Sequence, residues 1–178
     1  NPMPTTTATA VRVLELLKRI CETPAPTFEE EARANFITTL LLSMGLNPRL
    51  DAVGNVIAEG PGGTGQRVLV AVHLDTVFSK ETNVTVKEGN QKLFAPGIGD
   101  NSASLAVMLA YIEQVMSLEQ ALSQHLERPH LTFAATVGEE GLGDLRGMRE
   151  LMRTHASMVD AVIALDGHLG TIVDKAVG

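Results

Sequence analysis

The sequence predicts an α/β fold with a mixed, largely parallel central sheet flanked by helices. Apolar runs typical of buried strands, at residues 67–76, 130–137 and 160–167, alternate with segments of helical periodicity. The 178 residues suffice for one domain with a sizeable core, and a hydrophobic content of 44% is that of an ordinary globular protein. We therefore expect the strands to share one sheet with helices packed on it.

Helical periodicity opens the chain. Residues 8–21 place apolar side chains at helical spacing, and a second helix is expected after Thr27, which is a plausible N-cap because glutamates follow in the first turn. Residues 1–7 are expected to be a disordered end or one introduced by cloning. Nothing in either helix indicates chemistry.

From residue 48 the pattern changes to short β-type segments. Residues 55–60 and 67–76 predict strands, and residues 83–97 predict a hairpin that turns over a Gly-Asn pair. A long helix is expected from residue 102 to about residue 120.

The last third of the chain predicts a strand, a helix and a strand. Residues 130–137 form a continuous apolar run, residues 144–155 have helical spacing, and residues 160–167 form a second apolar run. We expect both of these strands to be buried.

Composition excludes several classes of partner. The net charge is −7 and no cluster of lysine or arginine occurs, so nucleic acid is not an expected partner. No apolar run is long enough to cross a bilayer and no signal-peptide pattern opens the sequence, so we expect a cytoplasmic protein without a membrane partner. The single cysteine, Cys21, cannot form an internal disulfide and fits a reducing compartment.

The three most apolar strands end in polar side chains. His73 and Asp75 end the first, Glu139 and Glu140 end the second, and Asp166 ends the third. Open α/β sheets gather their ligand sites at the carboxyl ends of their strands. We therefore expect these side chains to line one cleft.

Asp100, in the segment "APGIGDNSAS", is a sixth candidate for the same cleft. Five of the six side chains are carboxylates, which cannot all stay ionised at close range unless a cation holds them. A histidine with carboxylates suits zinc or a similar divalent ion. Two such ions can activate a water molecule and polarise a carbonyl group, so we expect a pair of metal ions.

Four motifs resemble a known family in their order and spacing: "HLDTV", "GIGDNSASLAVML", "GEEGLGDLRG" and "ALDG". They are similar to the co-catalytic zinc exopeptidases and deacylases, which include peptidase T, glutamate carboxypeptidase, aminoacylase and succinyl-diaminopimelate desuccinylase. The resemblance covers most of the chain. It implies hydrolysis of an amide bond in a small peptide or an N-acyl amino acid, with two zinc ions as cofactors.

The resemblance also implies a role for each candidate residue. His73 and Asp166 would bind the first metal, Glu140 the second, and Asp100 would bridge both. The peptide bond that follows Asp100 is often cis in this family.

Two further residues would take part in catalysis without binding metal. Asp75 would orient the imidazole of His73, and Glu139 would be the general base that takes a proton from the attacking water.

The family pattern contains parts that this sequence lacks. A histidine near the end of a longer chain would complete the second metal site, and a lid and dimerisation domain would follow a stretch like "IVDKAVG". The resemblance therefore implies that residues 1–178 are the N-terminal segment of one catalytic domain. Such a segment would be inactive alone, and the full-length protein would form a homodimer through the lid.

Two alternatives stay open. Peptidase and deacylase cannot be separated, although the form of "GEEGLGDLRG" favours a peptidase slightly. A non-catalytic α/β binding or assembly module with a vestigial metal site is the second class of function. The presence of Glu139 favours the enzyme, because a structural metal site has no use for a free base beside its ligands.

Overall fold

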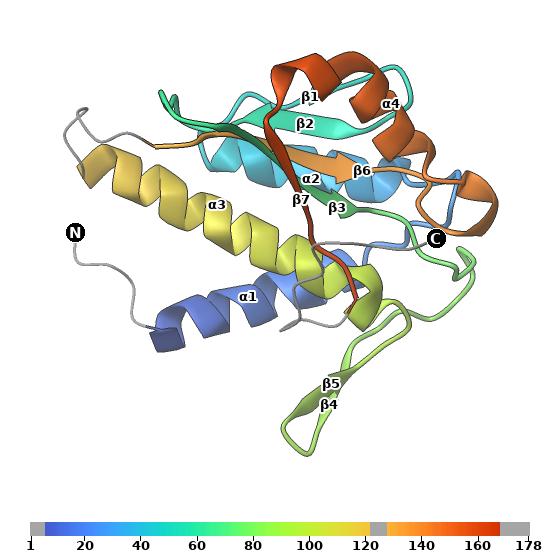
Figure 1. The fold of residues 1–178 in the computed structure, drawn as a ribbon. Coiled ribbons are helices and arrows are strands. Elements are labelled where there is room, and N and C mark those ends of the chain that lie inside the picture. The colour runs from blue at the N-terminus through green and yellow to red at the C-terminus, as the bar shows by residue number, and fades with distance from the viewer. Residues whose placement is uncertain (1–5, 122–127, 168–178) are drawn as a thin grey trace.

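The computed structural model describes residues 6–121 and 128–167. A five-stranded sheet with the order β1-β2-β6-β3-β7 forms its centre (Figure 1). Its strands are β1 (Arg49–Leu50), β2 (Val56–Glu59), β3 (Arg67–His73), β6 (His130–Thr136) and β7 (Ala161–Ala164). Strands β6 and β7 pair in parallel with β3, while β2 pairs antiparallel with β6 and with β1. The predicted α/β fold with a mixed, largely parallel sheet is confirmed.

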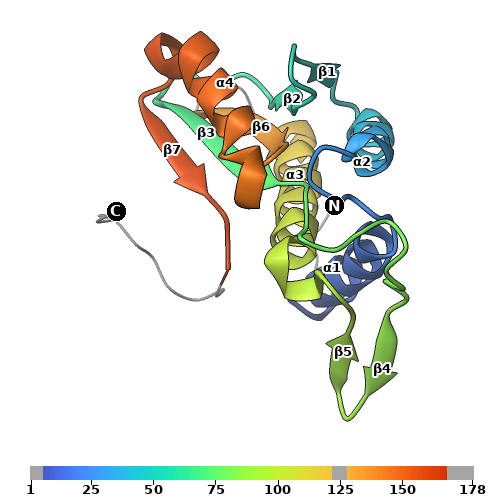
Figure 2. The same ribbon diagram turned by 90° about the vertical axis from the view of Figure 1, so that its right-hand side faces the viewer.

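Helices cover both faces of this sheet (Figure 2). Three helices share one apolar core on one face: α1 (Thr6–Cys21), α2 (Glu31–Ser43) and α3 (Ala103–Ala121). Helix α4 (Arg146–His155) packs on the opposite face. None of the helices among the described residues is long and apolar enough to span a bilayer.

The interior strand β3, which lies between β6 and β7, shows why its sequence is a continuous apolar run. Val70 and Val72 belong to the core under α1, α2 and α3, while Leu69 and Ala71 belong to the smaller core under α4. Successive side chains of a strand point to opposite faces, so a strand covered on both sides has no polar position. The chain becomes polar where β3 leaves these two layers, at His73.

A hairpin of β4 (Lys87–Gly89) and β5 (Lys92–Phe94) projects from the body of the molecule (Figure 1). The predicted hairpin is confirmed, but its turn differs by one residue. Asn90 and Gln91 have φ values of 51° and 59° and form the two-residue turn. Two positive φ angles match the twist of the flanking strands, so the turn consists of these two residues rather than of Gly89 and Asn90.

The N-terminal region differs from expectation in its helix starts. Helix α1 begins at Thr6, so residues 6 and 7 are helical rather than disordered, while residues 1–5 lie outside the described residues. Helix α2 begins at Glu31 with Glu30 at its N-cap position, so Thr27 does not cap it. The Thr27 hydroxyl instead donates a hydrogen bond to the carboxylate of Asp75, 2.9 Å away.

The prediction that residues 160–167 form a buried strand is also wrong. Strand β7 is present, but Val162 and Ile163 are 42% and 49% exposed. The reason is its position: β7 pairs only with β3 and forms an edge of the sheet over the part of the chain that the structure describes. An apolar run cannot distinguish a central strand from an edge strand when its neighbours are unknown.

Candidate metal centre

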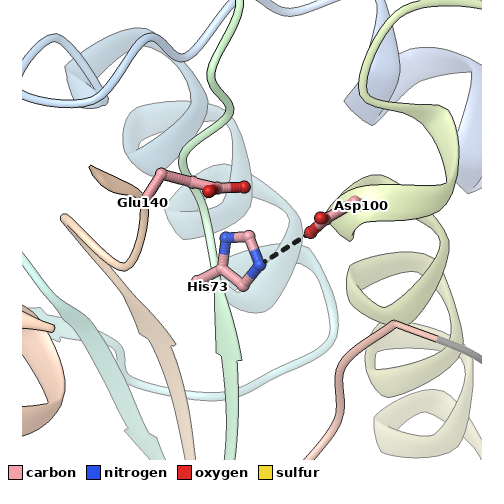
Figure 3. Close-up of side chains that lie close together, drawn as sticks. All are labelled: His73, Asp100 and Glu140. Atoms are coloured by element: carbon pink, nitrogen blue, oxygen red, sulfur yellow. Dashed lines mark hydrogen bonds and ion pairs between the residues drawn. The ribbon is translucent and has the colours of Figure 1, made fainter.

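The candidate residues gather where the parallel strands end. Ligand atoms of His73, Asp100 and Glu140 lie within 4.8 Å of one another (Figure 3). The Oδ1 atom of Asp166, which follows β7, lies 3.5 Å from Nε2 of His73. Three segments far apart in the sequence thus meet beside the end of β3, as the strand-end pattern predicted.

His73 is held in a defined orientation. Its side chain is 4% exposed, and its Nδ1 lies 3.0 Å from the backbone carbonyl oxygen of Asp75. When Nδ1 carries the proton and donates a hydrogen bond to this carbonyl, Nε2 keeps a free electron pair. Nε2 faces Oδ1 of Asp100 at 3.0 Å, so this nitrogen points into the cluster. The Asp75 carboxylate is more distant from Nδ1, at 3.6 Å.

Asp75 is completely buried, and its carboxylate accepts three hydrogen bonds. The donors are the backbone N–H groups of Glu139 and Glu140, at 2.9 and 3.0 Å, and the hydroxyl of Thr27. Burial alone would raise the pKa of Asp75, but the neighbouring His73 imidazole and these three hydrogen bonds lower that pKa well below its usual value. Asp75 therefore stays ionised and fixes the backbone of both glutamates.

Side chains replace a strand partner at the end of β6. Four consecutive backbone N–H groups, at residues 137–140, donate to side-chain oxygens. Asn55 accepts the first, Glu30 the second and Asp75 the last two. Buried N–H groups need such acceptors, so these three residues determine the path of the chain into the metal centre.

Negative charge is concentrated in the cluster. Burial raises the pKa of Glu139, and the nearby Asp166 and Asp100 raise it further against the lowering effect of His73. Burial and the neighbouring Asp100 and Glu139 likewise raise the pKa of Glu140. Crowded carboxylates around one imidazole nitrogen are the donor set of a divalent cation such as zinc, so the residues present fit a metal ion.

The loop that carries Asp100 is joined to the end of β7. Asp100 lies in a turn over Ile98–Ser102, and its peptide bond to Asn101 is cis, as expected for the resembled family. The Asn101 side chain donates a hydrogen bond of 3.0 Å to the carbonyl oxygen of Leu165. This contact links the segment of Asp100 to the residue before Asp166, so the two carboxylates are placed together.

The family model for peptidase family M28 matches residues 55–171, a span that contains all six candidate residues. The chain belongs to peptidase family M28. It is therefore a metallopeptidase-family hydrolase, and its resemblance to the zinc exopeptidases is confirmed.

Named relatives of this M28 chain are longer than it is. A Pyrococcus furiosus protein provisionally named LysW-lysine/LysW-ornithine hydrolase is 33% identical over 129 residues, which are 72% of this chain and 34% of that protein. A Thermococcus kodakarensis protein of the same name is 39% identical over 64 residues, 36% of this chain and 18% of that protein. The matched part of this chain thus spans about a third of the first relative and 18% of the second.

Solved structures share the fold of this M28 chain. The aminopeptidase PepT of Bacillus cereus superposes with a TM-score of 0.70 at 20% identity, covering 88% of this chain and 43% of that one. An M20 family metallo-carboxypeptidase of Sulfolobus solfataricus gives a TM-score of 0.68 at 18% identity, covering 85% and 36%. Identities this low show the fold alone.

Sequence reasoning found the polar ends of the strands but missed the residues that support them. Glu30 looked like one of three glutamates in the first turn of a helix, and Asn55 and Arg146 looked like ordinary strand and helix residues. The available signal was the helix start itself, where a glutamate is a poor N-cap. His168 follows Asp166 closely in the sequence but is not predicted to bind metal, and it lies outside the described residues.

Proposed function

We propose that this chain carries the metal centre of a hydrolase that cleaves an amide bond in a small peptide or an N-acyl amino acid. The observation that carries the proposal is the cluster of His73, Asp100 and Glu140, whose ligand atoms lie within 4.8 Å. Family M28 membership supports the reaction class. Two zinc ions are the proposed cofactors.

Four side chains would hold the two ions. His73 and Asp166 are proposed for the first, because Nε2 and Oδ1 lie 3.5 Å apart at the ends of neighbouring parallel strands. Asp100 faces the same nitrogen at 3.0 Å and is proposed as the bridge, and Glu140 as a ligand of the second ion. When bound, the pair would lower the pKa of a water molecule and polarise the substrate carbonyl.

Glu139 is the proposed general base and Asp75 the residue that orients the site. Asp75 binds the N–H groups of both glutamates, so their side chains leave the backbone from fixed positions. Glu140 gives its electrons to a cation, while Glu139 keeps an oxygen for the proton of the attacking water. Glu139 then passes this proton to the leaving nitrogen.

We further propose that residues 1–178 are the N-terminal segment of one catalytic domain in a longer cytoplasmic protein. The P. furiosus relative is covered over only 34% of its length, which supports this reading. In that case the histidine of the second metal, the lid and a homodimer interface belong to the remainder. The segment alone would then be inactive.

The test uses the full-length protein, purified with zinc and assayed against a panel of amides. The panel holds dipeptides, N-acyl amino acids and conjugates that release lysine or ornithine, because the named relatives are LysW-lysine/LysW-ornithine hydrolases. We expect hydrolysis that a chelator abolishes and added zinc restores. Zinc binding without hydrolysis of any member would favour the non-catalytic module instead.

A further inference from the structure

A buried carboxylate lies directly behind the metal centre. Glu30 is 4% exposed and stands at the N-cap position of α2, yet its side chain makes no capping hydrogen bond. Capping therefore does not explain why a charged side chain is buried there. A buried carboxylate is stable only when it is paired and hydrogen-bonded.

Arg146, the first residue of α4, is the partner of this carboxylate. One terminal nitrogen of Arg146 contacts both carboxylate oxygens of Glu30 at 2.8 Å. The other terminal nitrogen donates to the carbonyl oxygen of Val53 at 2.9 Å, and the guanidinium lies over the ring of Phe28 at 5.4 Å. The pair thus joins α2, α4 and the loop before β2.

Both partners of this pair also bind Gly138. The N–H of Gly138 donates to Oε1 of Glu30 at 2.9 Å, and the backbone N–H of Arg146 donates to the carbonyl oxygen of Gly138 at 3.1 Å. The Arg146 side chain packs so closely on Gly138 that an added Cβ would lie 2.5 Å from its Nε. Gly138 also has a φ of 61°, which favours glycine.

We propose that Glu30 and Arg146 form a positioning clamp that sets the geometry of the metal centre through Gly138. Gly138 is the residue before Glu139 and Glu140, whose N–H groups are bound from the other side by Asp75. The clamp and Asp75 therefore hold this segment between them. The inference rests on the proposed function, because it assigns the clamp a role only through the two glutamates.

Loss of the clamp is expected to displace the two glutamates from their positions in the metal centre. Displacing catalytic groups by about 1 Å can cost about a hundredfold in rate. Residues that orient the ligands of a metal typically change its affinity or the activity by about 10–100-fold when replaced. Because the clamp acts through the backbone of Gly138, replacing Glu30 or Arg146 should lower kcat and leave KM nearly unchanged.

The test compares three variants of the full-length protein. Glu30→Ala removes both the acceptor for the Gly138 N–H and the partner of Arg146. Glu30→Gln keeps the shape of the side chain and one acceptor oxygen. The control is Glu113→Ala, which breaks a similar arginine–carboxylate pair with Arg12 between α1 and α3, with an N–O distance of 2.6 Å. Zinc affinity, amide hydrogen exchange over residues 136–141 and steady-state kinetics are measured for each.

For Glu30→Ala we expect faster exchange at the Gly138 amide, zinc binding weakened about tenfold or more, and a similar loss of kcat. Glu30→Gln should recover most of each loss, and Glu113→Ala should change none of them. Unchanged exchange would overturn the clamp, and so would faster exchange without loss of zinc affinity. Equal losses in Glu113→Ala would also overturn it, because they would indicate general destabilisation.

Two arrangements keep the test decisive. If Glu30→Ala does not fold, Arg146→Lys replaces it, because it keeps the charge but cannot contact Glu30 and Val53 together. If the parent protein binds zinc but hydrolyses no amide, the proposed function fails while zinc affinity and exchange still decide the clamp. The two failures are therefore distinguishable.

Discussion

Asp75 links the orientation of the His73 imidazole to the position of the two glutamates. Its backbone carbonyl oxygen accepts a hydrogen bond from Nδ1 of His73, and its carboxylate accepts hydrogen bonds from the N–H groups of Glu139 and Glu140. One buried residue therefore orients a ligand on β3 and two acidic groups after β6. The different roles proposed for the adjacent glutamates require that this fixed backbone direct their side chains differently.

The roles proposed for these acidic residues predict which substitutions lower activity alone and which also remove zinc. In the full-length protein, Glu139→Gln should retain its zinc but lose about 10²–10⁴-fold in kcat, the usual contribution of a general base. Asp100→Ala should lose zinc and activity together, because a bridging ligand serves both ions. Elemental analysis and kinetics on the same samples check this. Glu139→Gln with nearly full activity would exclude Glu139 as the base.

Gly138 is a position where the backbone conformation and the packing both disfavour a side chain. Gly138→Ala would combine a φ of 61° with a Cβ placed 2.5 Å from Nε of Arg146. We expect a loss of about 1–3 kcal/mol in the free energy of unfolding. Gly89→Ala is the control, since nothing lies within 4 Å of its added Cβ. Denaturant unfolding measures both, and equal effects would contradict the assigned strain.

At the scale of elements, local patterns predicted the helices and strands, whereas tertiary contacts decided the errors. The periodicity of α1 and α3 and the apolar run of β3 come from adjacent residues. Thr27 has the composition of an N-cap, but its hydroxyl binds Asp75, which is distant in the sequence. Glu30 was missed for the same reason, because its partners lie just after β6 and at the start of α4. The site was predictable because strand ends are local features, while its supports are not.

Strand β7 is held to β3 at its start by an ion pair that predicts an acid dependence. Arg67 donates to Asp160 through its backbone and its guanidinium, and these bonds lower the pKa of Asp160 to about 2. A lowered folded-state pKa adds stability above the unfolded value, and this is lost as pH falls through about 2. Asp160→Asn should therefore lower Tm slightly at pH 7 and not at pH 2. An equal loss at both values would show that charge is not responsible.

At the scale of the whole molecule, the fold gathers polar side chains from distant parts of the sequence at one edge of the sheet. The apolar cores under α1, α2, α3 and α4 leave the carboxyl ends of β3, β6 and β7 as the place where charged side chains meet. The M28 assignment and the superposed solved structures agree with this arrangement. The matched part of the chain spans only 34% of the P. furiosus relative, so the substrate named for that relative is not assigned to this chain.

The exposed edge of β7 has a consequence for anyone who expresses this chain by itself. Val162 and Ile163 are 42% and 49% exposed on the outermost of the described strands, and unpaired strand edges are templates for edge-to-edge aggregation. The isolated chain should self-associate as its concentration rises, and Ile163→Lys should suppress this by placing a charge on the edge. Light scattering across a dilution series would show it. A chain that stays monodisperse at high concentration would mean that β7 is already protected, and it would make this segment convenient for crystallisation and NMR.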